Sequence, residues 1–371
     1  MLGEGFVYSV LSFLLVFTVL VFFHELGHYL IARLNGVRVS TFSIGFGREL
    51  FGWTDRSGTR WKVSLIPLGG YVKFFGDVGP SSGKAADEEF SEEEKKVTFH
   101  HKRLGQRAAI VAAGPLANFV LAIIIFTGLF IWMGRPVTPA NVEEVLPGSP
   151  AAAAGLQPGD RILSVDNTEV KRFEDLQQII RMHPEEEMPL VVQRGDERMN
   201  LSVTPRLEVL KDDFGNTQRI GLLGISTTAA EYVPVPPGKA VVQAVDETFN
   251  VISLTFKSIG QMFAGKRSTE ELGGPIRIAQ MSGQVAQQGF SSLISFTAIL
   301  SVNLGLINLF PIPILDGGHL LFYAFEAVLG RPLSARAQEY GLRFGLALVM
   351  TLMIFATWND LSALLFSKLF S

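Results

Sequence analysis

Long stretches without a charged residue constrain this chain more than any other feature of its sequence. The first, residues 6–23, would span about 27 Å as a helix, close to the hydrocarbon thickness of a bilayer. Three further apolar runs cover residues 108–133, 290–315 and 344–358, and the third is interrupted by asparagines and prolines. The first run is preceded only by Glu4 and continues into a polar motif, which is unlike a signal peptide. The sequence therefore predicts four transmembrane helices.

Basic residues predict how these spans are oriented. They gather between the first and second spans and again between the third and fourth, at Arg33, Arg38, Arg48, Lys102, Arg103, Arg107, Arg331, Arg336 and Arg343. Because cytoplasmic loops carry an excess of Lys and Arg, both loops should face the cytoplasm, which leaves residues 134–285 outside. A net charge of −3 gives no basic surface for a nucleic acid, and the absence of cysteine leaves only His, Asp and Glu as ionisable metal ligands.

The cytoplasmic segment, residues 35–103, predicts β-structure followed by a loop. Residues 61–66 alternate apolar and polar side chains, residues 67–70 favour a turn, and residues 71–75 continue as a strand. This apolar hairpin could enter the bilayer edge if its backbone is covered, or it could form a small cytoplasmic sheet. Residues 77–96 are acidic and rich in Ser and Gly, which predicts a flexible, solvated loop.

The external segment, residues 135–232, predicts a small α/β domain. A strand, a short Ala-rich helix ended by Gly155, another strand, a helix over 173–182 and a hairpin around residues 194–196 follow one another. This succession resembles a bacterial PDZ domain, which implies a groove that binds a peptide C-terminus, its loop formed by Gly221, Leu223, Gly224 and Ile225. The alternative is a mixed α/β fold with no ligand. Within residues 233–285, an amphipathic helix over 241–263 should lie at the membrane interface.

The motif His24-Glu25-Leu26-Gly27-His28 follows the first apolar run. On a helix, residues four apart share a face, so both imidazoles can reach one Zn²⁺. Glu25 would lie beside the metal, where it can accept a proton from water and pass one to the leaving amine. The alternative is a satisfied polar cluster at the membrane interface.

A catalytic zinc needs a third protein ligand and an open position for water. Asp316 lies at the inner end of the third run, at the depth expected for His28. Asp316 and His319 compete for this role on sequence alone. His100, His101 and His183 occupy polar stretches and are predicted to lie at the surface.

Three motifs in combination resemble the site-2 proteases, and among them the bacterial group of sigma-E regulators. They are the histidine motif, Gly114-Pro115-Leu116-Ala117-Asn118, and the stretch 308–317 that contains Asn308 and Asp316. The resemblance implies that His24, His28 and Asp316 bind zinc, that Glu25 is the catalytic acid and base, and that Asn308 holds substrate or the oxyanion. Enterobacterial members carry two PDZ domains and this chain has room for one, so a two-domain gate is in doubt.

Together these features predict an α+β membrane protein with four transmembrane helices, a membrane-associated β-hairpin and one external PDZ domain. The divisions are residues 1–34, 35–103, 104–134, 135–232, 233–285, 286–330 and 331–371. The hairpin resembles the family's re-entrant loop, which implies substrate contacts at Val63, Leu65, Gly70 and Tyr71.

The resemblance also implies a multi-pass protein of the bacterial inner membrane whose PDZ domain is periplasmic. Its substrates would be single-span proteins such as trimmed anti-sigma factors, and remnant signal peptides. One alternative is a non-enzymatic PDZ scaffold in the membrane, which would not need Glu25. A second is a membrane-anchored protease acting on soluble proteins, which would carry the motif in a water-facing domain.

Overall fold

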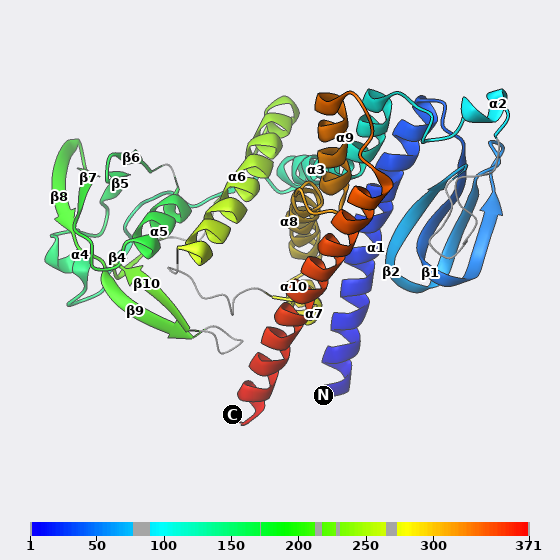
Figure 1. Cartoon of the computed structure of the whole chain (residues 1–371). Helices are drawn as coiled ribbons and strands as arrows, with labels where there is room; N and C mark the ends of the chain where they lie inside the picture. The colour runs from blue at the N-terminus through cyan, green and yellow to red at the C-terminus, as the bar shows by residue number, and fades with distance from the viewer. Residues whose placement is uncertain are drawn as a thin grey trace. The chain divides into compact units, whose positions relative to one another are not determined.

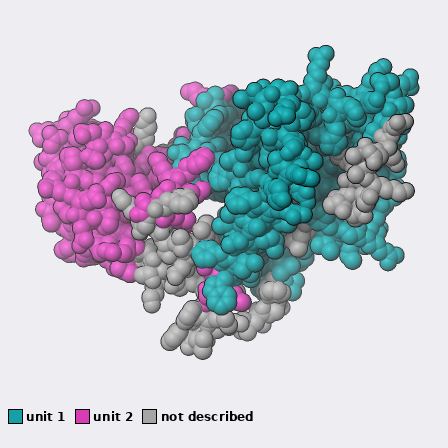
Figure 2. Space-filling view, in the orientation of Figure 1, with its two compact units in different colours: residues 1–127, 241–255, 273–358 teal, residues 128–240, 256–272, 359–371 magenta. Residues whose placement is uncertain are grey.

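The computed structural model of the chain describes residues 2–76, 90–170, 172–211, 217–227, 231–264 and 273–369. They divide into two units, coloured separately in Figure 2. The first comprises residues 1–127, 241–255 and 273–358, and the second residues 128–240, 256–272 and 359–371. Residues 77–89, most of the predicted flexible loop, lie outside the described residues.

Four helices among the described residues are long and apolar enough to cross a membrane, as predicted. They are α1 (Leu2–Leu34), α3 (Leu104–Trp132), α8 (Phe290–Asn308) and α10 (Ala335–Leu369) (Figure 1). The third differs from its predicted extent because α8 ends at Asn308, and α9 (Asp316–Leu329) begins only after a non-helical connection. Pro311 and Pro313 lie in this connection, and proline cannot donate the backbone hydrogen bond that a continuing helix needs.

Close packing of α1, α3 and α8 forms the centre of the first unit. Val16 and Leu20 of α1 are buried against Leu121 of α3. A Cβ on Gly27 would lie 2.7 Å from the Ala117 side chain, so glycine is needed where α1 meets α3. This contact allows side chains on the two helices to share one site.

Nearly all of the predicted hairpin, residues 61–74, is instead part of one long strand, β2 (Arg60–Phe74), which pairs with β1 (Val39–Thr54) and is joined to it by a turn at residues 55–59. The predicted turn over residues 67–70 is wrong, because these residues continue β2. Residues 60–63 and 70–73 both pair with residues 41–44 of β1, so β2 passes from one edge of that stretch to the other. Gly69 has a φ of +111°, which a side chain would disfavour, and it allows this irregular path.

Three further helices belong wholly or partly to the first unit. The short helix α2 (Glu92–Lys95) begins with a capping box between Ser91 and Glu94. The helix α7 (Pro275–Gln287) packs on the beginning of α1, where a Cβ on Gly283 would lie 2.7 Å from Ser9 Cβ. The predicted amphipathic segment is the helix α6 (Pro237–Phe263), of which residues 241–255 belong to this unit.

The second unit has the succession of elements that the sequence predicts. The helix α5 (Phe173–Met182) contributes buried Leu176 and Ile180 to its core. The short helix α4 (Pro150–Ala153) is followed by Gly155 with a φ of +81°. A four-stranded sheet consists of β5 (Arg161–Val165), β6 (Thr168–Glu169), β7 (Met188–Arg194) and β8 (Glu197–Val203). Its strands lie in the order β6-β5-β7-β8.

Among its described residues, the second unit also contains three two-stranded antiparallel pairs. They are β3 (Arg135–Val137) with β12 (Glu231–Val233), β4 (Glu144–Val145) with β11 (Ile225–Ser226), and β9 (Arg206–Lys211) with β10 (Thr217–Leu222). The predicted peptide-end loop, residues 221–225, therefore joins β10 to β11.

Candidate metal centre

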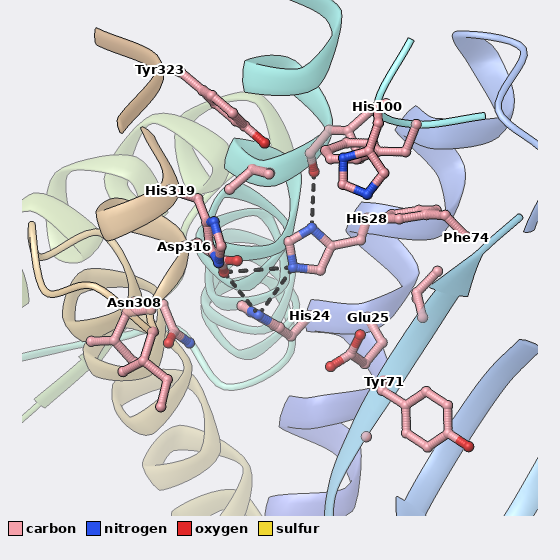
Figure 3. Close-up of a pocket in the computed structure, with 17 residues that line it drawn as sticks. His24, Glu25, His28, Tyr71, Phe74, His100, Asn308, Asp316, His319 and Tyr323 are labelled. Atoms are coloured by element: carbon pink, nitrogen blue, oxygen red, sulfur yellow. Dashed lines mark hydrogen bonds and ion pairs between the residues drawn. The ribbon is translucent and has the colours of Figure 1, made fainter. Parts of the chain in front are cut away.

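Three potential metal ligands from two distant parts of the chain meet between α1 and α9 (Figure 3). His24 and His28 lie one turn apart on α1, and their Nε2 atoms are 3.3 Å from each other. Asp316 is the first residue of α9, and its Oδ2 lies 3.2 Å from His24 Nε2 and 3.5 Å from His28 Nε2. The three atoms thus form a nearly equilateral triangle.

The size and chemistry of this triangle fit a zinc ion. Ligand atoms about 2.1 Å from a tetrahedral zinc are separated from one another by about 3.4 Å. The observed separations of 3.2, 3.3 and 3.5 Å match this spacing. Two imidazoles and one carboxylate are also a donor set used by zinc hydrolases, with the fourth position left for water or substrate. Of the two competing residues, Asp316 rather than His319 completes the triangle.

Residues of α3 fix the far side of both imidazoles. His28 Nδ1 is 2.9 Å from the carbonyl oxygen of Ile110, and His24 Nδ1 is 3.2 Å from the side-chain amide of Asn118. Between these contacts, a Cβ on Gly114 would lie 2.5 Å from His28 Cε1 and 2.9 Å from His24 Cε1. The Gly114 position therefore needs glycine for the two rings to occupy their places.

Glu25 lies beside the triangle and points into the same pocket (Figure 3). Its carboxylate is within hydrogen-bonding range of the Val72 backbone amide on β2. A Cβ on Gly70 would lie 3.0 Å from Glu25 Cγ and 2.8 Å from Val21 Cγ1, so the missing side chain lets β2 approach α1 here. The strand and the carboxylate are thereby held together.

A pocket of about 470 Å³ surrounds the three ligands and Glu25. Asn308, the last residue of α8, lines it, as do Gly70 and Tyr71 of β2. Val63 and Leu65, the other two predicted hairpin contacts, do not line the pocket and are 37% and 59% exposed. Val63 pairs with Ile44 of β1 on the side opposite Gly70, a difference within β2 that the sequence did not reveal.

Sequence reasoning missed Tyr323, and it considered His319 only as a possible metal ligand. His319 and Tyr323 follow Asp316 on α9 and line the pocket, and His100, predicted to lie at the surface, is exposed and also lines it. The spacing of Asp316, His319 and Tyr323 by three and then four residues places them on one face of α9, which was a usable signal. The predicted loop residues Gly221, Leu223, Gly224 and Ile225 belong to the second unit.

Comparison with known proteins gives matches over nearly the whole chain. A sequence model of peptidase family M50 matches residues 12–352. A protein of Agrobacterium fabrum named as a zinc metalloprotease is 47% identical over 362 residues, covering 96% of this chain and 96% of its own. Metalloprotease MmpA of Caulobacter vibrioides is 38% identical over 383 residues, again covering 96% of each chain.

Among solved structures, the PDZ domain of an SdrC-like protein from Listeria monocytogenes aligns with 25% of this chain and 92% of its own. Its sequence identity is 20% and its TM-score is 0.20. A likeness of this size does not assign the fold of the aligned segment.

Proposed function

Because this chain belongs to peptidase family M50, the site-2 protease family, we propose that it is a zinc endopeptidase that cuts its substrates within the membrane. One observation carries the proposal. His24 and His28 lie inside the candidate span Val7–Leu34, and they meet Asp316 with the separations of a tetrahedral zinc site. His24, Glu25 and His28 are three ionisable groups near the end of one apolar helix, where each costs free energy to bury unless it is paired or functional.

In the proposed site, His24, His28 and Asp316 hold the zinc ion. When bound, zinc would polarise a substrate carbonyl and lower the pKa of a water at its open position. Glu25 takes one proton from the attacking water and delivers it to the amine as the carbon–nitrogen bond breaks. Asn308, at the pocket wall, donates a hydrogen bond to the developing oxyanion. The second proton of the water passes from the new carboxylic acid to the amine, so the products are a carboxylate and an ammonium group.

The substrate must be extended at the cut, because the amides of a helix are shielded by their own hydrogen bonds. Within the described part of the chain, no second strand pairs with residues 70–73 of β2 beside residues 41–44 of β1, and the Val72 amide meets the Glu25 carboxylate. Gly70, Tyr71, Val72 and Phe74 also line the pocket. We infer that an unwound substrate segment adds to this edge as a strand, which places its carbonyl beside Glu25.

Single-span membrane proteins are the proposed substrates, such as anti-sigma factors already trimmed outside the membrane and remnant signal peptides. We place the chain in the bacterial inner membrane as a multi-pass protein, and the distribution of Lys and Arg supports an orientation with residues 135–232 on the periplasmic side. In the second unit, residues 221–225 join β10 to β11, which supports a PDZ-type loop for a peptide C-terminus.

The test uses the purified full-length protein in lipid vesicles with a single-span substrate whose outer domain is truncated. Wild-type protein should release fragments whose masses place the cut inside the apolar segment, and a zinc chelator should abolish cleavage. Glu25→Gln should retain one zinc per chain and lose cleavage, because it removes the proton acceptor and none of the ligands.

Each alternative has its own outcome. Cleavage only outside the apolar segment would indicate a membrane-anchored protease that acts on exposed chains. Zinc binding without cleavage of any single-span substrate, with partner binding unaffected in Glu25→Gln, would indicate a scaffold. Both results contradict the proposal.

A further inference from the structure

One face of α3 contacts both histidines of the candidate metal centre. Ile110, Gly114 and Asn118 recur every four residues, so they lie along one stripe of the helix. The Ile110 carbonyl oxygen can only accept a hydrogen bond, so its contact of 2.9 Å requires the proton of His28 on Nδ1. His28 Nε2 then carries a lone pair, which it presents toward Asp316 and His24.

His24 has no main-chain carbonyl in the corresponding place, and its Nδ1 meets the side-chain amide of Asn118 at 3.2 Å. Asn118 is fully buried, and the nearer amide atom is Nδ2. Its Oδ1 is buried with no hydrogen-bond partner in the described part of the chain. Leaving a buried polar atom without a hydrogen bond costs about 1–3 kcal/mol, which raises the question of how the Asn118 amide is oriented.

Turning the amide by 180° exchanges its oxygen and nitrogen with almost no change in shape. Oδ1 then faces His24 Nδ1 and can accept a hydrogen bond from it. The oxygen gains a partner while Nδ2 takes the place that it leaves, so the amide as a whole gains no hydrogen bond. What changes is His24, whose proton is now fixed on Nδ1, as it is in His28. Both imidazoles then present an Nε2 lone pair to the same point.

We propose that Asn118 is a positioning residue for the metal centre, whose Oδ1 accepts the Nδ1 proton of His24 and so directs the Nε2 lone pair toward the zinc ion. This inference rests on the proposed function, since it assumes that His24 binds zinc. Hydrogen bonds of this kind to ligating histidines fix the tautomer and the ring orientation, and losing one typically weakens metal affinity about 10–100-fold.

Contacts with α8 explain how Asn118 is held in place beside His24. Ser301 Oγ of α8 donates to the main-chain oxygen of Asn118 at 2.8 Å. A Cβ on Gly305 would lie 3.3 Å from Asn118 Cβ, so α8 packs directly on this residue. The main chain of Asn118 is therefore fixed between two helices, and its side-chain amide is directed to His24. A purely structural residue would serve α8 and leave His24 unaffected.

The test compares zinc affinity in four full-length proteins, measured by competition with a chelator in detergent. They are the wild type, Asn118→Leu, Asn118→Asp and Ser301→Ala. Leucine keeps the approximate shape and has no acceptor, so zinc affinity should fall about 10–100-fold. Aspartate keeps an acceptor in the same place, so zinc affinity should remain within a few-fold of wild type. Ser301→Ala removes a hydrogen bond at the same helix contact without touching His24 and should bind zinc as the wild type does.

A second measurement separates ligand geometry from loss of folding. With cobalt in place of zinc, visible absorption reports the arrangement of the ligands. Asn118→Leu should change this spectrum, while the Asp variant and Ser301→Ala should keep the wild-type spectrum. The proposal is overturned if Asn118→Leu binds zinc as tightly as wild type, if the Asp variant is as weak as the Leu variant, or if Ser301→Ala loses as much affinity. Failure of the wild type itself to bind zinc would instead overturn the proposed function.

Discussion

Arg107 and Glu326 form an ion pair, with Arg107 Nη2 2.5 Å from Glu326 Oε1, that joins the first turn of α3 to α9. Both side chains are only 15% exposed, and the Arg107 guanidinium also lies over the Tyr323 ring at 5.0 Å. Because α9 begins at Asp316, this pair fixes the helix that supplies the third proposed ligand against the helix that contacts both histidines.

Breaking this pair on one side should destabilise the protein. Glu326→Gln leaves the Arg107 charge without its carboxylate; removing one partner of a fully buried pair costs about 3–5 kcal/mol, and this partly buried pair should cost less. The double variant Arg107→Leu/Glu326→Leu removes both charges and should recover most of that loss. The measurement is the free energy of unfolding from denaturant titration in mixed micelles. A double variant less stable than either single variant would contradict this account.

Gly114→Ala should abolish zinc binding while the protein still folds. The added Cβ would lie 2.5 Å from His28 Cε1 and 2.9 Å from His24 Cε1, so both rings must move away from the triangle. A matched control is Gly128→Ala on the same helix, where a Cβ meets nothing within 4 Å. Metal content of the purified proteins, measured by mass spectrometry of the released metal, distinguishes them. Equal zinc content in both variants would show that the rings tolerate the methyl group.

The sequence was informative where a local pattern carried the chemistry. The His24-Glu25-x-x-His28 spacing places both imidazoles on one helical face, and the structure brings them together. The predicted helix over residues 173–182 and the number of candidate spans also agree with the structure, because each is marked by its own periodicity or length, although the third span ends at Asn308. Its own sequence context left Asp316 and His319 as alternatives, the family resemblance favoured Asp316, and the structure places Asp316, the first residue of α9, in the triangle.

Contacts between distant parts of the chain were not predictable in the same way. Asn118 meets His24 across 94 positions, and Arg107 meets Glu326 across 219. Neither pair has a spacing that local geometry could reveal, since both depend on how separate helices pack. The path of β2 was mispredicted for a related reason. Residues 67–70 have the composition of a turn, but pairing of β2 with both edges of β1 keeps them extended.

In the second unit, Asp160 should make stability depend on pH in the acid range. Arg194 donates to Asp160 at 2.7 Å, and this hydrogen bond, together with one from the Gln157 amide, holds the pKa of Asp160 below its ordinary value. An unfolded Asp has a pKa of about 3.9. A lowered folded pKa means that the stabilisation is complete above pH 4 or so and is lost as pH falls through the folded pKa.

Asp160→Asn should therefore lower stability at neutral pH and flatten the acid dependence. The readout is urea unfolding of the full-length protein at several pH values, followed by pulse hydrogen-exchange labelling of peptides from β5 and β7. Wild type and variant should converge as pH falls below about 4, because protonation removes the charge that the variant already lacks. A constant difference between them down to pH 2 would argue against Asp160 as the titrating group.

Gly70→Ala should separate catalysis from metal binding. A Cβ at this position would lie 2.8 Å from Ser43 O and 3.0 Å from Glu25 Cγ, so β2 must withdraw from α1 or Glu25 must turn. The three proposed ligands lie on α1 and α9 and do not depend on this contact. We expect zinc content to remain at the wild-type level and kcat/KM to fall at least 100-fold, since a displacement of about 1 Å at a catalytic group can cost that much.

Initial rates of the Gly70→Ala variant on the truncated single-span substrate, together with metal analysis of the same preparation, give both quantities. Loss of zinc together with activity would mean that β2 supports the ligands themselves, and unchanged activity would mean that Glu25 does not need the close approach of β2.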